Sequence, residues 1–108
     1  MKSYLTHLEC TYCGVTLTAD EPARTCPKCG KVLYARYDLN AAKRQMSPTT
    51  IKGRPGSMWR YFEVLPVREE ANIVTLREGF TPIFKAERLG RKLGLKSLYI
   101  KDEASNPT

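Results

Sequence analysis

The chain has 108 residues, of which 42% are hydrophobic and 27% charged, the balance of an ordinary globular protein. Its formal net charge is +7, from 18 basic and 11 acidic residues. No apolar stretch approaches the length of a membrane span, and the first nine residues contain no apolar run of signal-peptide length. We therefore exclude a membrane protein and expect a cytoplasmic chain that forms one small domain, or a small domain plus part of another.

The positive charge is concentrated in the middle of the chain. Residues 1–30 and 61–108 are close to neutral, whereas residues 31–60 hold seven basic residues against Asp38 alone, a net charge of +6. A nucleic-acid-binding finger needs its lysines and arginines on the metal module itself. The distribution therefore argues against nucleic acid as a partner.

Every cysteine lies in one of two Cys-x-x-Cys-Gly motifs. The first is Cys10-Thr-Tyr-Cys13-Gly14, and the second is Cys26-Pro-Lys-Cys29-Gly30. Two cysteines three positions apart can bind one ion from a single tight turn, and the following glycine suits the positive φ of that turn. Four thiolates complete the tetrahedral shell of Zn²⁺ and leave no position for water. We therefore predict a structural zinc site whose ligands are Cys10, Cys13, Cys26 and Cys29.

Other chemistries for the four cysteines remain open at this point. Two disulfides have three possible pairings, but a cytosolic chain keeps its thiols reduced. A redox pair would need one Cys-x-x-Cys motif rather than two matched copies, and iron in a rubredoxin-like site also accepts four thiolates. His7 lies near Cys10 in the sequence, but four sulfurs already fill the shell, so we interpret it as a strand residue.

Short extended segments surround the two motifs. Residues 3–9 and 32–37 alternate in side-chain character with a period of two, and Val15-Thr-Leu17 follows the first motif as a short return strand. A helix over residues 41–46 can be capped by Asp38 or Asn40. Antiparallel strands that join two such motifs form a zinc ribbon, and we assign the ribbon with its trailing helix to residues 1–46. A lobe of this size depends on metal to fold, because its core is too small.

The next segments read as a linker and an amphipathic helix. Residues 47–57 are rich in Pro, Gly, Thr and basic residues, which is typical of a linker. Ser57 can cap a helix over residues 58–65, in which Trp59, Phe62 and Leu65 share one apolar face. We expect that face to pack in a core, but the first 57 residues offer it no large partner.

The remainder alternates between strand and helix signals. Residues 73–76 and 83–84 look extended, residues 86–93 look helical with Gly94 as the C-terminal cap, and residues 98–100 look like a buried strand. We therefore expect residues 58–108 to begin an α/β body.

From Met58 onward the sequence resembles the threonine synthase family of pyridoxal-phosphate (PLP) enzymes. The matching pieces are Met58-Trp-Arg-Tyr61 with Leu65-Pro66, Leu76-Arg-Glu-Gly79, Thr81-Pro-Ile83, Arg88-Leu-Gly90, Leu93-Gly-Leu95, and Leu98-Tyr-Ile-Lys-Asp-Glu103 with Asn106-Pro-Thr108. They keep the order and spacing of the family, and a ribbon ahead of the catalytic body occurs in a subset of it. The resemblance thus implies a small β zinc ribbon followed by the N-terminal part of a PLP-dependent fold-type II domain, truncated at residue 108.

The resemblance also implies an activity for the complete enzyme. Threonine synthases convert O-phosphohomoserine and water to threonine and phosphate with PLP. In the family, Asn-Pro-Thr runs into Gly-Ser-Phe-Lys, whose lysine forms the Schiff base with the cofactor, and this lysine would lie beyond Thr108. We therefore expect the 108 residues alone to be inactive, with the remainder of the catalytic domain as their partner and a phospho-amino acid as the substrate of the whole. A homodimer is a further assembly that we consider.

A few residues match positions near the substrate or cofactor site of the family. Lys101 and Glu103 match its strand-end pair, and Asn106 and Thr108 match the start of its lysine-bearing loop. We expect Lys101 and Glu103 to form an ion pair that supports the loop, with contact between Lys101 and the substrate phosphate as the alternative. Arg77 and Phe80 stand where smaller residues are expected, and Ala104-Ser105 replaces Gly-Leu.

Two other functions compete with this reading. A cysteate-synthase-like paralogue would use phosphoserine and sulfite on a similar scaffold. A free-standing zinc-ribbon module would instead bind an acidic or nucleic-acid partner through residues 31–60, the basic connector. It would also have a self-contained core after residue 57.

Overall fold

The structure, a computed structural model that describes residues 1–107, divides into two compact units. The first unit comprises Met1–Pro55 and Trp59–Ile73, and the second comprises Gly56–Met58 and the residues from Val74 onward. Within residues 1–107 no helix is long and apolar enough to cross a bilayer.

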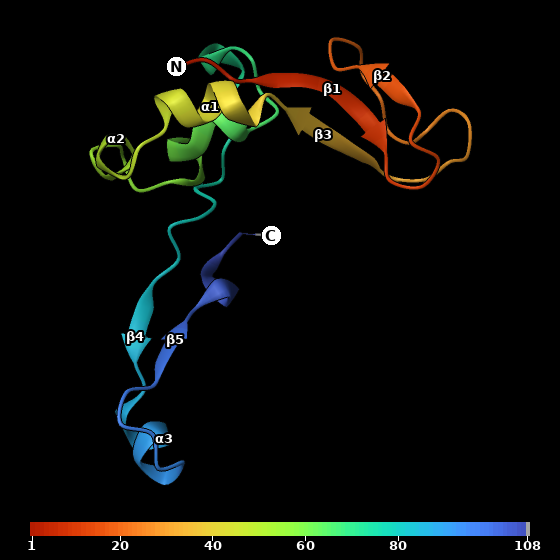
Figure 1. The fold of residues 1–108 in the computed structure, drawn as a ribbon. Coiled ribbons are helices and arrows are strands. Elements are labelled where there is room, and N and C mark those ends of the chain that lie inside the picture. The colour runs from red at the N-terminus through yellow and green to blue at the C-terminus, as the bar shows by residue number, and fades with distance from the viewer. Residues whose placement is uncertain (108) are drawn as a thin grey trace. The chain divides into compact units, whose positions relative to one another are not determined.

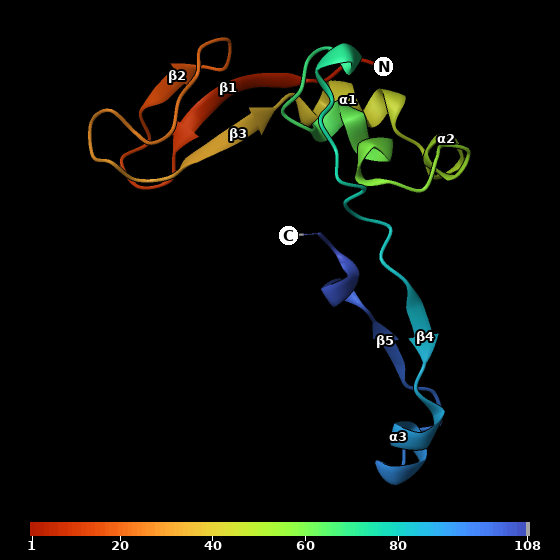
Figure 2. The same cartoon turned by 180° about the vertical axis from the view of Figure 1, so that it is seen from behind.

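A three-stranded antiparallel sheet forms the frame of the first unit (Figure 1). Its central strand β1 (Leu5–Cys10) lies between β2 (Thr16–Thr18) and β3 (Leu33–Tyr37). Figure 2 shows the same order from behind. Half-buried and exposed residues alternate along β3, as the sequence pattern predicts. The three strands confirm the expected extended segments to within about two residues.

Two short helices follow the sheet. Helix α1 (Leu39–Gln45) starts at Asp38, whose carboxylate accepts a hydrogen bond from Ala41 N at 2.9 Å, so one of the two predicted caps is confirmed. Helix α2 (Pro48–Lys52) occupies much of the segment that we predicted as a linker. The side chain of Ser47 caps it by accepting from Thr50 N at 3.0 Å. Composition identifies Pro and Thr as turn formers but misses that Ser47-Pro48 is also a good helix start.

The segment that follows packs against the first unit rather than remaining without a partner. Residues Met58–Val64 form η1, a 3₁₀ helix with a kink at Tyr61, in place of the predicted α-helix over 58–65. Phe62 is fully buried, and Tyr4 N donates to Glu63 O at 2.9 Å. Ser3 Oγ donates to Leu65 O at 2.7 Å. Phe62 of the predicted apolar face is therefore buried within the first unit, and Ser3 and Tyr4 from the first 57 residues bond to the segment around it.

A buried ion pair between Arg54 and Glu63 stabilises this part of the first unit. The guanidinium of Arg54 donates to both carboxylate oxygens of Glu63, at 2.8 and 2.6 Å, and to Arg60 O at 2.5 Å. The two side chains of the pair are only 15% and 5% exposed. The hydrogen bonds from Arg54 lower the pKa of Glu63 below its ordinary value, so the pair stays charged at neutral pH.

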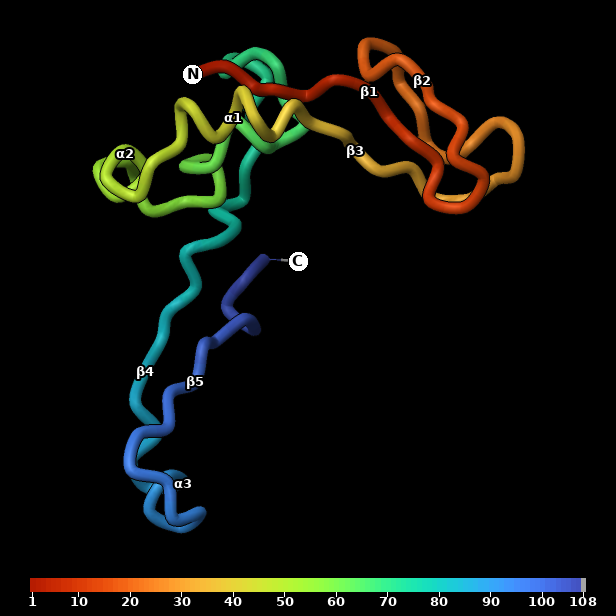
Figure 3. Tube along the Cα trace, viewed as in Figure 1, coloured from red at the N-terminus to blue at the C-terminus, as the bar shows by residue number. Residues whose placement is uncertain are grey.

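The second unit is built on a two-stranded hairpin. Strand β4 (Ile83–Lys85) pairs antiparallel with β5 (Tyr99–Lys101), and helix α3 (Glu87–Lys92) connects them, as the tube in Figure 3 follows. The 3₁₀ turns η2 (Glu70–Asn72) and η3 (Glu103–Ser105) lie in the first and second unit respectively. Gly94 has a φ of +70°, as expected for the cap of α3.

Two expectations for the second unit differ from the structure. Residues 73–76 form no strand; instead the carboxylate of Glu78 accepts hydrogen bonds from Leu76 N at 3.0 Å and Thr75 Oγ1 at 2.5 Å, which folds them into a turn. Strand β5 forms where expected but is exposed on this chain, with Tyr99 57% and Ile100 37% exposed.

The compact units group residues differently from the domains proposed from the sequence. Residues 59–73 belong with the ribbon in the first unit, where Phe62 and Glu63 are buried. The division into residues 1–46, 47–57 and 58–108 stays a prediction about the organisation of a larger protein.

We predict that Glu63→Gln lowers the free energy of unfolding of the first unit by as much as about 3–5 kcal/mol, because it leaves the Arg54 charge buried without a carboxylate. Since the pKa of Glu63 is lowered in the folded chain, its contribution is present above the ordinary carboxyl range and is lost only as pH falls through the lowered value. The loss measured by guanidinium unfolding should therefore be equal at pH 5.5 and pH 7.5.

The exposed pair between Glu9 and Arg36 provides the matched control. Glu9→Gln should cost much less stability than Glu63→Gln in the same measurement, because this pair is solvated. Equal losses of stability in the two variants would contradict the prediction that the buried pair stabilises the first unit more than the exposed pair does.

Candidate metal centre

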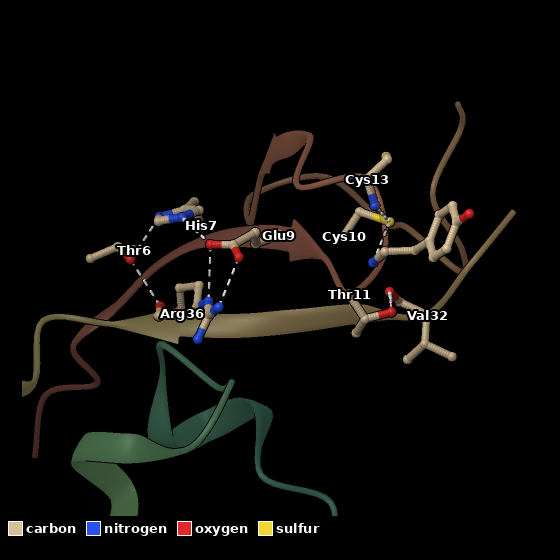
Figure 4. Close-up of polar contacts among 9 residues, drawn as sticks. Thr6, His7, Glu9, Cys10, Thr11, Cys13, Val32 and Arg36 are labelled. Carbon is tan, nitrogen blue, oxygen red and sulfur yellow. Dashed lines mark hydrogen bonds and ion pairs between the residues drawn. The ribbon is translucent and has the colours of Figure 1, made fainter. Parts of the chain in front are cut away.

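The first cysteine motif forms a tight turn at the end of β1. Gly14 N donates to Cys10 O at 3.2 Å and Cys10 N donates to Val15 O at 2.9 Å, which closes the turn on both sides. Inside it, Tyr12 N and Cys13 N both point at Cys10 Sγ, each at 3.4 Å (Figure 4). These two N–H groups favour the thiolate form of Cys10, the form that binds a metal.

The second motif repeats the same backbone pattern. Gly30 N donates to Cys26 O and Cys26 N donates to Lys31 O, both at 2.8 Å. Gly14 and Gly30 share a φ of +71°, and a Cβ at either position would meet nothing within 4 Å. Glycine is therefore required here by the backbone conformation and not by crowding, as the sequence predicts.

The two turns bring the four sulfurs into one cluster. The Sγ atoms of Cys10, Cys13, Cys26 and Cys29 all lie within 4.8 Å of one another. Cys10 Sγ lies 3.4 Å from Cys29 Sγ, and Cys13 Sγ lies 3.6 Å from the sulfurs of both Cys26 and Cys29. A tetrahedron of thiolates with Zn–S bonds of about 2.3 Å has edges of about 3.8 Å, so the cluster fits a metal of this size.

The cysteines are free thiols rather than disulfides. All four are unpaired, and their shortest S–S separation of 3.4 Å far exceeds a covalent bond of about 2.0 Å. Cys10 and Cys26 are buried, while Cys13 and Cys29 are partly exposed. The four-cysteine cluster in a small sheet is compatible with a zinc ribbon.

Within the cluster, the pKa values of Cys10 and Cys29 are shifted in opposite directions. The N–H of Cys13, and less strongly that of Tyr12, lowers the pKa of Cys10 to about 6 against the opposing effect of burial. The N–H of Lys31 lowers the pKa of Cys29, but desolvation and the hydrogen bonds with the other three thiols outweigh it and raise the value to about 12. A bound cation would remove this conflict by neutralising the clustered negative charge.

The sheet next to the cluster is held by polar contacts of its own. Arg36 donates to both oxygens of Glu9, at 3.0 and 2.8 Å, and Thr11 donates from N and Oγ1 to Val32 O (Figure 4). His7 lies on β1, where its Nδ1 is 3.0 Å from Thr6 Oγ1, and it is not part of the cysteine cluster. Its interpretation as a strand residue is confirmed.

The residues predicted to border a substrate or cofactor site lie in the second unit. Lys101 Nζ is 3.6 Å from Glu103 Oε1, so the expected ion pair is present, and Asn106 Oδ1 accepts from Gly79 N at 2.9 Å. Thr108 lies outside the described residues. The structure brings Lys101, Glu103 and Asn106 to one end of the hairpin; their place beside a substrate stays a prediction.

Sequence reasoning missed two contributors. The backbone N–H groups of Tyr12 and Cys13 carry no side-chain signature, although the Cys-x-x-Cys spacing itself implies them. Thr81 contacts both Lys101 and Glu103, and a threonine before a proline suggests only a turn.

Comparison with known proteins finds threonine synthases. The chain is 42% identical over 99 residues to the threonine synthase of Methanocaldococcus jannaschii, covering 92% of this chain and 24% of that protein. It is 42% identical over 102 residues to the threonine synthase of Methanosarcina acetivorans, covering 94% of this chain and 24% of that protein. This chain is a homologue of threonine synthase. The family resemblance stated from the motifs is confirmed.

The likeness to threonine synthase has two limits. The chain spans about a quarter of the length of these relatives, 24% in each case. It is also 36% identical over 94 residues to the cysteate synthase of Methanocella paludicola, covering 86% of this chain and 19% of that protein. No family model and no solved structure matches the chain.

We predict one zinc ion per chain, measured by native mass spectrometry or metal analysis. Cys13→Ser should lose the ion, because a hydroxyl is a far weaker ligand than a thiolate. Tyr12→Ser in the same turn is the control, since its side chain is 78% exposed and its N–H group is retained. Metal loss in both variants, or four free thiols and no metal in the unmodified chain at neutral pH, would rule out the site.

Metal affinity should rise with pH. Cys29, with its pKa raised to about 12, is protonated throughout the neutral range and must lose its proton when a metal binds. The apparent affinity should therefore increase at least about tenfold per pH unit between pH 6.5 and 7.5. Competition with a chelator at the two pH values tests this, and a flat profile would contradict thiolate ligation by Cys29.

Proposed function

We propose that this chain is the zinc-binding N-terminal portion of a threonine-synthase-type enzyme. The complete enzyme would use PLP to convert O-phosphohomoserine and water to threonine and phosphate. The observation that carries the proposal is 42% identity to two threonine synthases over 92% and 94% of the chain. PLP would supply the electron sink for the chemistry at the substrate.

In this proposal the residues of the first unit have a structural role. Cys10, Cys13, Cys26 and Cys29 would hold Zn²⁺ in a closed shell that offers no site to a substrate. The second unit would begin the α/β body of fold type II, and its strand-end residues Lys101, Glu103 and Asn106 would border the substrate or cofactor site. The Schiff-base lysine is expected after Thr108, so the 108 residues would be inactive by themselves.

A cysteate-synthase-type enzyme is the second candidate, because the chain is 36% identical to one such protein. Substrate choice distinguishes the two, since that reaction would consume phosphoserine and sulfite. A free-standing binding module is less well supported by the charges. Arg36 and Arg54, two of the seven cations of the basic connector, are already engaged by Glu9 and Glu63 within the chain.

The test is an assay of the intact gene product, loaded with PLP and zinc. It should release phosphate from O-phosphohomoserine and form threonine, identified by mass spectrometry, and should show at least about a hundredfold lower kcat/KM with phosphoserine and sulfite. The 108-residue chain is the control and should give no product. Turnover of phosphoserine and sulfite alone would favour the second candidate, and turnover of neither would refute both.

A further inference from the structure

A compact polar cluster joins the two strand ends of the second unit. Thr81 lies just before β4, and Lys101 is the last residue of β5. Lys101 Nζ donates to Thr81 O at 2.8 Å and to Thr81 Oγ1, and Thr81 Oγ1 donates to Glu103 Oε1 at 2.7 Å. Because a hydroxyl has one proton and Glu103 takes it, the Thr81 oxygen is left to accept from Lys101. The three side chains thus form one consistent network with Thr81 at its centre.

A main-chain bond lies beside this network. Asp102 N donates to Pro82 O at 2.9 Å, immediately after the last strand pair, in which Ile83 lies opposite Lys101. The ion pair of Lys101 and Glu103 is solvated, with side chains 54% and 62% exposed, so by itself it adds little stability. Beside the bond from Lys101 Nζ to Thr81 O, the hydroxyl of Thr81 therefore links both members of this weak surface pair to the segment that leads into β4.

The turn before Thr81 leads to Asn106. Arg77 and Phe80 have φ values of 70° and 51°, in the region where a residue with a Cβ is strained, so this turn must be held by its surroundings. Gly79 N, between them, donates to Asn106 Oδ1 at 2.9 Å. Since N–H groups only donate, the oxygen of Asn106 must face Gly79, and its Nδ2 group must point elsewhere as a donor.

We propose that Thr81 is a positioning residue, which fixes the turn at Gly79 and through it the side-chain orientation of Asn106. The inference rests on the function proposed above, in which Asn106 opens the loop that leads to the cofactor lysine. Thr81 contacts no substrate in this proposal; it acts by tying residues 79–82 to residues 101–106.

The first experiment measures the network directly in the intact enzyme. Thr81→Val keeps the shape of the side chain but removes its donor and acceptor, whereas Thr81→Ser keeps both. Hydrogen–deuterium exchange at the Gly79 amide should accelerate about tenfold in Thr81→Val and stay near the native rate in Thr81→Ser. Thr49→Val, at an exposed position in the other unit, controls for the substitution itself.

The second experiment asks whether the orientation matters to the reaction. Thr81→Val should lower kcat by about tenfold or more with a smaller change in KM, because loop placement and not substrate contact is altered. Thr81→Ser should restore most of kcat, which a mere loss of bulk would not allow.

The outcomes separate this inference from the proposed function. Unchanged exchange at Gly79 in Thr81→Val would overturn the inference whatever the enzyme does. Accelerated exchange with native kcat and KM would overturn the positioning role. If the unmodified enzyme turns over cysteate-synthase substrates instead, the proposed function fails, but the exchange and kcat comparisons still decide the role of Thr81 on that reaction.

Discussion

The convergence of four cysteine sulfurs on one point organises the first unit. Its buried hydrophobic residues are few: Leu5, Cys10, Cys26, Ala41, Ala42 and Phe62. Burial of so little apolar surface hardly offsets the conformational entropy of more than sixty ordered residues. A structural zinc ion contributes an apparent ~10–16 kcal/mol in small metal-nucleated folds, more than the whole net stability of many domains. A metal ion bound by the four cysteines would therefore decide whether the sheet of β1, β2 and β3 stays folded.

The other end of the same sheet is fixed by a different kind of interaction. Strand β1 continues from residues 3 and 4, which bond to the backbone around Glu63 and Leu65, and the buried carboxylate of Glu63 is matched by Arg54. Burying this pair is favourable only when both charges are present and hydrogen-bonded. Residues 1–55 and 59–73 thus form one unit, in which Ser3 and Tyr4 bond to the backbone of the later segment and Arg54 pairs with Glu63.

Features of the fold could be predicted from the sequence where the interactions that determine them lie within a few residues of one another. The cysteine spacing, the glycines at positive φ, the alternation along β3 and the Asp38 cap are set within a few residues, and all could be predicted. The apolar spacing of residues 58–65 predicted that Phe62 packs in a core, but the bonds from Ser3 to Leu65 and from Tyr4 to Glu63 join distant parts of the chain, which no local pattern encodes. Residues 73–76 have the β-branched composition of a strand, yet the carboxylate of Glu78 draws them into a turn. Arg77 and Phe80, which depart from the expected smaller residues, occupy the left-handed region that small residues favour.

The second unit carries an apolar surface that its own residues do not cover. Phe80, Ile83 and Phe84 are 67%, 65% and 50% exposed, and both strands are exposed along their whole length. Strands with large apolar side chains at successive positions, rather than in alternation, are typical of sheets that are covered on both faces. Such a pattern gives little benefit to an isolated hairpin, since two strands alone are marginally stable in water. It suits a segment whose surroundings are supplied by a larger α/β body, which is the setting that the proposed function requires.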